Sequence, residues 1–199
     1  GTITVAGNLA SANSDDALYN IANLTLSSSA GTTINGNITT SGNQSYYVDS
    51  LTLGNSNFLN ASAITIAPYT NGRAVQLAGS DPGAVLYLSQ ATLNRMSAMD
   101  LVIGGNNAGT ITVAGNLASA NSDDALHNIT NLTLSSSAGT TINGNITTVG
   151  DQNFRGDVWV GNPDGSPIKG RANHLVSYIG NIKFHGSVND AACGGYCGG

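Results

Sequence analysis

The sequence predicts an all-β protein, folded as a right-handed parallel β-helix with short strands and turns rich in asparagine and glycine. Three observations lead to this fold class: a long internal repeat, short segments that alternate apolar and polar residues, and turn clusters between those segments. In such a fold the chain winds successive coils upon one another, and each coil covers the one before it.

The repeat is the strongest of the three observations. Residues 1–42 return at residues 109–150 with three substitutions. These replace Tyr19 by His127, Ala22 by Thr130 and Ser41 by Val149. Short, evenly spaced strands admit a sandwich or barrel as well as a β-helix. The repeat favours the β-helix, because a further copy lengthens a stack without disturbing its closure.

The expected strands follow one another along the chain. Each is a short run in which apolar and polar side chains mostly alternate, as they do in a half-buried strand. In order, they occupy residues 2–5, 24–26, 33–34, 51–53, 63–66, 75–77, 85–88, 101–103, 110–113, 132–134, 141–142, 158–160 and 182–184. Turn clusters of Asn and Gly separate them, for example at residues 35–37 and 104–107.

One segment departs from this alternation. Residues 88–99 place apolar side chains at helix-like spacing after Ser89, which predicts a single helical turn at a corner of the fold. We expect residues 1–190 to form one β-solenoid rod and residues 191–199 to form a Gly- and Cys-rich tail. Coils of roughly 20 residues would give about nine or ten levels, or about 45 Å at ~4.8 Å per level.

The composition narrows the classes of partner. Charged residues make up 9% of the chain and the formal net charge is −5, whereas a typical globular domain carries about 25% charged residues. Lys and Arg together number 6, so the chain has no basic stripe for nucleic acid or anionic membranes. No apolar run approaches the roughly 20 residues of a membrane-spanning helix.

Two phrases of the sequence resemble a known family. Residues 88–115 combine Leu88-Ser89, an Asn-Arg step, an L-x-I-G strand at 101–104 and an apolar-Thr-apolar strand at 111–113. Residues 180–188 read G-x-I-x-F-x-G-x-V. Both phrases are similar to those of large bacterial exoproteins of the filamentous haemagglutinin type, the two-partner secretion class of β-solenoids. The resemblance covers most of residues 1–190.

The resemblance implies a secreted adhesin on the bacterial cell surface, exported by an outer-membrane transporter. Family members usually begin with an N-terminal secretion domain that finds no match here, which predicts an excised piece or a C-terminal portion. We therefore expect a non-catalytic adhesin or stalk segment whose partner is a glycan or protein on a host or neighbouring cell. Self-association end to end into fibres is a second expected role, because an uncapped terminal strand offers unpaired backbone groups.

The alternative function is a polysaccharide-binding or polysaccharide-cleaving β-solenoid enzyme. Cleavage needs carboxylates that face one bond at a defined separation, whereas the charged residues here are scattered. The acidic pairs at 15–16 and 123–124 fall in repeated Asn-Ser-Asp-Asp loops that we interpret as solvated turns. His127, His174 and His185 share no ligand spacing. We therefore predict no enzyme activity, no catalytic residue, no metal site and no cofactor.

Cys193 and Cys197 form the one local feature that could carry covalent chemistry. The glycines between them let the chain close a small loop, and a disulfide needs Cα atoms within about 7 Å. The alternatives are an interchain link, free thiols, or a metal clip that lacks two further ligands. By resemblance, a two-cysteine loop near the C-terminus implies a device that holds such adhesins in their transporter.

The aromatic side chains have two interpretations. Tyr46, Tyr47 and Phe58, or Phe154 and Trp159, could stack on sugar rings or fill the core. We favour the core, because a β-helix commonly stacks its aromatic residues inside the coil.

Overall fold

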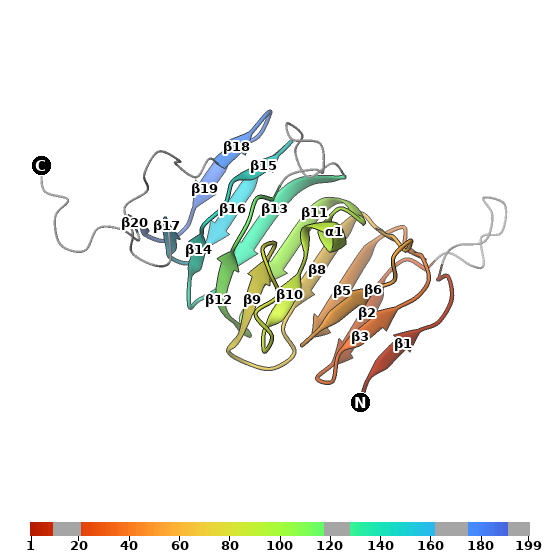
Figure 1. Cartoon of the computed structure of the whole chain (residues 1–199). Helices are drawn as coiled ribbons and strands as arrows, with labels where there is room; N and C mark the ends of the chain where they lie inside the picture. The colour runs from red at the N-terminus through yellow and green to blue at the C-terminus, as the bar shows by residue number, and fades with distance from the viewer. Residues whose placement is uncertain (10–20, 118–127, 162–174, 191–199) are drawn as a thin grey trace, which may run out of the picture.

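The computed structural model describes residues 1–9, 21–117, 128–161 and 175–190 (Figure 1). Within these ranges the chain forms short strands and one helix, and every strand pair is parallel. The predicted all-β class is therefore confirmed. An antiparallel sandwich is wrong for these ranges, because hairpin neighbours would run in opposite directions.

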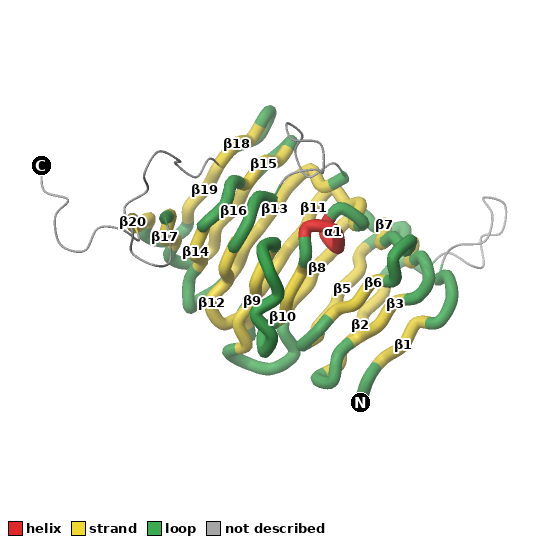
Figure 2. The backbone as a smooth tube through the Cα atoms, in the orientation of Figure 1, coloured by secondary structure: helices red, strands yellow, loops and turns green. Residues whose placement is uncertain are grey.

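The elements lie in a stacked order that Figure 2 traces as yellow strands joined by green turns. Their bounds, in chain order, are β1 Ile3–Val5, β2 Leu24–Ser28, β3 Thr32–Ile34, β4 Ile38–Thr39, β5 Asn43–Val48, β6 Leu51–Leu53, β7 Leu59–Asn60, β8 Ala63–Ala67, β9 Arg73–Leu77, β10 Leu86–Leu88, α1 Gln90–Leu93, β11 Met96–Gly104, β12 Ala108–Val113, β13 Ile129–Ser135, β14 Thr140–Ile142, β15 Ile146–Thr148, β16 Gln152–Arg155, β17 Val158–Val160, β18 Leu175–Ser177, β19 Ile182–Phe184 and β20 Val188–Asp190.

Two long sheets dominate the structure. One has the order β2-β5-β8-β11-β13-β16-β19, and the other the order β10-β9-β12-β14-β17-β20. Shorter sheets join β1, β3 and β6, and β15 and β18. The chain visits the two long sheets in turn, so each strand pairs with one that follows after a full excursion of the chain.

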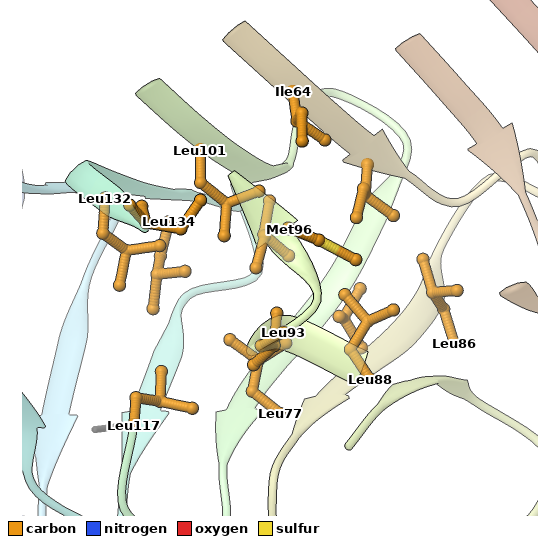
Figure 3. Close-up of a cluster of buried hydrophobic side chains, with 14 of the residues drawn as sticks. Ile64, Leu77, Leu86, Leu88, Leu93, Met96, Leu101, Leu117, Leu132 and Leu134 are labelled. Atoms are coloured by element: carbon orange, nitrogen blue, oxygen red, sulfur yellow. The ribbon is translucent and has the colours of Figure 1, made fainter. Parts of the chain in front are cut away.

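The core is built from side chains that stack in register. Ile64 pairs with Leu101, which pairs with Leu132, and the exposed fraction of each side chain is 1% or less. Figure 3 shows these residues with Leu134 in one cluster of buried side chains. Alternate residues along a strand point to opposite faces, so a level adds one apolar residue to each inward stack and leaves its polar neighbours outside.

Asparagine side chains fix the register at the turns. Asn8 Oδ1 accepts the N–H of Asn37 at 2.8 Å, and Asn37 Oδ1 accepts the N–H of Phe58 at 3.0 Å. The same bond recurs from Asn23 to Asn43, Asn116 to Asn145, Asn131 to Asp151, Asp151 to Asn181 and Asp157 to Ser187. Each turn amide thus finds an acceptor on the preceding level, where a lost partner would cost about 1 kcal/mol or more.

The two sequence copies adopt the same register. Ile3 pairs with Thr32 and Ile111 pairs with Thr140, while Leu9 and Leu117 each form an isolated parallel bridge with the equivalent isoleucine. The repeat therefore specifies local pairing as well as composition.

A non-repeated insertion lies between β9 and β11. Helix α1 begins after Ser89, whose hydroxyl accepts the N–H of Thr92 at 3.0 Å, so the predicted helical turn is confirmed. Strand β10 pairs with β9 on the edge opposite β12. The guanidinium of Arg95 then donates to the carbonyls of Leu53 and Gly54, which end β6.

Two sequence expectations need correction. The spacing of roughly 20 residues holds from Gln44 to Ile64 but not from Ile64 to Leu101, because the insertion with β10 and α1 intervenes. Strand β5 was also missed, because its inward residues include Gln44, which a sequence pattern reads as a surface position. In the structure Gln44 is fully buried.

Candidate binding groove

Most of the polar residues singled out in the sequence lie outside the described residues. This holds for Asp15, Asp16, Asp123, Asp124, His127, His174, Cys193 and Cys197. The disulfide between the two cysteines therefore stays a prediction. His185 is described and is exposed just beyond the end of β19.

The aromatic residues divide between core and surface. Tyr46 and Phe154 are buried, with exposed fractions of 0% and 1%, which confirms the core interpretation for these two. The interpretation is wrong for Tyr47 and Phe58, whose exposed fractions are 41% and 53%. Tyr46 and Tyr47 are neighbours on β5, so strand alternation sends one ring inward and the other outward.

Tyr47 lies at one side of an open groove on the outer face of the large sheet. The groove has a volume of about 420 Å³ and follows the ends of β5, β8, β11, β13 and β16. Its lining residues are Tyr47, Thr65, Ala67, Pro68, Val102, Gly104, Gly105, Asn106, Asn107, Ser135 and Arg155. Tyr47 and Arg155 are four strand spacings apart, or about 19 Å at ~4.8 Å per strand.

Small residues form the floor between these two side chains. Tyr47 pairs with Ala67, and Gly104 pairs with Ser135, which in turn pairs with Arg155. Gly104 has a φ of +92°, and a Cβ built on it would lie 2.2 Å from the carbonyl oxygen of Ser135. Only glycine fits this backbone, and its missing side chain keeps the centre of the groove shallow and open.

Arg155 supplies the only formal charge of the groove lining, which contains no Asp or Glu. Within the described part of the chain, no hydrogen bond or ion pair engages its guanidinium. Lys183, on the neighbouring strand, instead donates to Asp151 at 2.8 Å. This bond and the N–H of Asn181 lower the pKa of Asp151. The groove therefore presents one uncompensated cation on a chain of net charge −5.

The described residues offer little for metal or redox chemistry. No three His, Cys, Asp or Glu side chains within those ranges come together as a metal site would require. The aspartates that are described hold turns instead: Asp81 accepts the N–H of Gly83, Asp100 accepts the amide of Asn131, and Asp157 accepts both donors of Ser187. Over the same ranges, no helix has the length and apolar character needed to span a bilayer.

The sequence gives only a faint signal for the groove. Tyr47 and Arg155 occupy equivalent places 108 residues apart, each three residues after the aligned Asn43 or Asp151 and beside a conserved glutamine-to-aromatic step within the chain. Their outward direction could have been read from alternation, but the opening between them depends on Gly104 and on which strands become neighbours. No family model, curated protein or solved structure matches this chain, so its function is argued from its own residues.

Proposed function

We propose that this chain is a non-catalytic segment of a secreted, cell-surface adhesive stalk, folded as a right-handed parallel β-solenoid of the filamentous haemagglutinin type. The observation that carries the proposal is the parallel ladder from β2 to β19, which adds strands without closing on itself. A ladder of this kind can be extended by repeats, which suits a spacer that holds a binding surface away from a cell.

The chemistry of the outer face supports an adhesive role over a catalytic one. Hydroxyl and amide side chains predominate there, as in the outward row in which Thr25 pairs with Ser45 and Ser45 pairs with Thr65. The described aspartates are engaged in turns, so no pair of carboxylates is placed to act as acid and base on one glycosidic bond.

A retention assay with the purified chain tests this proposal. The chain is immobilised and exposed to fluorescent neutral and acidic polysaccharides and to whole cells, and both retained label and newly formed reducing ends are measured. An adhesive stalk retains intact material and releases no fragments. Fragments would favour the enzyme alternative, and no retention on any surface would contradict adhesion.

End-to-end assembly into fibres is a separate part of the proposed role. Sedimentation velocity over a hundredfold range of protein concentration measures it directly. Assembly predicts species that grow with concentration, whereas a single monomeric boundary throughout would contradict fibre formation and leave the stalk proposal standing.

A further inference from the structure

The groove between Tyr47 and Arg155 has the properties of a ligand site. Its cation is isolated: Arg95 is engaged by backbone carbonyls and Lys183 by Asp151, whereas Arg155 has neither kind of partner within the described ranges. A guanidinium presents donors in a planar fork that matches a carboxylate. The lining holds no carboxylate to satisfy it, so an anionic group from outside the chain is its natural complement.

The rest of the groove suits a sugar chain. The ring of Tyr47 is 41% exposed and offers an apolar face with a polar edge. Asn106 and Asn107 are exposed on the loop beside it, and the hydroxyls of Thr65 and Ser135 line the same opening. None of these four side chains has a hydrogen-bond partner within the described part of the chain, so all can exchange water for the hydroxyls of a ligand.

The dimensions indicate an extended ligand. About 19 Å separates the levels of Tyr47 and Arg155, and the floor at Ala67 and Gly104 carries almost no side chain. A single small anion would meet Arg155 alone. A chain of several rings would instead reach the aromatic face, the amides and the guanidinium together.

We propose that this groove binds an oligosaccharide that carries carboxylates, with Arg155 pairing with a carboxylate and Tyr47 stacking on a ring several units away. The proposal gives a ligand class to the adhesive role above and rests on that role for its biological setting. The contact itself is a property of the isolated chain.

Isothermal titration calorimetry of the full chain with a short oligogalacturonate tests the contact. The methyl-esterified form of the same oligosaccharide keeps the shape and removes the charge. We expect binding of the acid form, and a Kd at least about tenfold weaker for the ester and for Arg155→Gln, because a charged hydrogen-bonded pair is lost. Tyr47→Ser should weaken binding of the acid and the ester alike.

Lys183→Gln is the matched control, since it removes the same charge from the next strand outside the groove. Its Kd should stay within about twofold of the parent, and circular dichroism should show all variants folded. Equal binding by Arg155→Gln and the parent, equal loss in Lys183→Gln, or equal binding of a poly-glutamate peptide would overturn the proposal. If the retention assay still shows adhesion while Arg155→Gln binds normally, this inference fails and the adhesive role remains.

Discussion

Two buried glutamines show how one atom separates the two copies of the repeat. Gln44 donates from Nε2 to the carbonyl oxygens of Ile38 and Asn60, and its Oε1 accepts the hydroxyl of Tyr46 at 2.8 Å. Gln152 keeps the equivalent Nε2 bonds, but Phe154 stands where Tyr46 does and Oε1 has no partner. Burial raises the pKa of Tyr46, which keeps its phenol a donor.

Restoring or removing this hydroxyl should change stability in opposite directions. Phe154→Tyr should raise the free energy of unfolding by about 1 kcal/mol, because Gln152 Oε1 gains a donor. Tyr46→Phe should lower it by about 1–2 kcal/mol, because Gln44 Oε1 is left buried without one. Urea unfolding of both variants and of the double exchange measures this, and a stabilised Tyr46→Phe would contradict the account.

Aspartates at the turns make stability depend on pH. Burial raises the pKa of Asp49, but hydrogen bonds from Thr70 and the nearby Arg73 outweigh burial and leave that pKa lowered. The hydroxyl and N–H of Ser187 lower the pKa of Asp157. A lowered pKa in the folded state means that the unfolded chain binds more protons, so this stabilisation is present above the unfolded value and is lost in acid.

We expect the free energy of unfolding to be level near neutral pH and to fall as the pH drops below about 4, the range of the unfolded Asp pKa. Asp157→Asn keeps the acceptor oxygen for the N–H of Ser187 and removes the titration, so its acid decline should be shallower. Urea unfolding between pH 7 and pH 2.5 measures the slope. Identical slopes in the parent and the variant would show that Asp157 does not contribute.

Among the elements, β10 and α1 depend on one clamp. The sheet order ends at β6 on one side and restarts at β10 on the other, and no ladder joins the two strands. Arg95 bridges the gap by donating to Leu53 and Gly54 while its Nε donates to Ala91 at 3.0 Å. The insertion is therefore attached by side-chain bonds where the rest of the fold uses backbone pairing.

Arg95→Ala should lower the free energy of unfolding by about 1–3 kcal/mol, the range for hydrogen bonds to a charged group. Amide hydrogen exchange should accelerate in residues 90–95 before it does in β8 or β13. Arg155→Ala is the control for losing an arginine, and it should stay within about 0.5 kcal/mol of the parent because its side chain is exposed. Equal losses in the two variants would contradict the clamp.

For the whole molecule, the repeat predicts a length increment. Strands β2 and β13 are equivalent in the two copies and are four steps apart in one sheet, through β5, β8 and β11. Inserting a further 108-residue period should lengthen the stack by about 19 Å at ~4.8 Å per strand. Small-angle X-ray scattering measures this as a larger maximum dimension at constant cross-section. A wider cross-section at constant length would contradict the stacked arrangement.

The sequence was a good guide wherever apolar and polar residues alternate. The strands around Ile64, Leu101 and Leu132 were placed correctly because each buries its apolar residues. It was a poor guide to β5, where a buried Gln44 mimics a surface residue, and to the groove, where Tyr47 and Arg155 are distant in the chain. Both depend on which side chains the neighbouring levels supply.

The sequence alone determined the parallel all-β class, the turn bonds and the identical pairing of the two copies, because these depend on local alternation and on asparagine at fixed positions. Only the tertiary structure decided burial. Ile111 and Leu117 are fully buried, whereas the same residues of the first copy, Ile3 and Leu9, are partly exposed. The physical reason is that a side chain in this stack is covered by the levels on both sides, and β1 has a paired strand on one side alone.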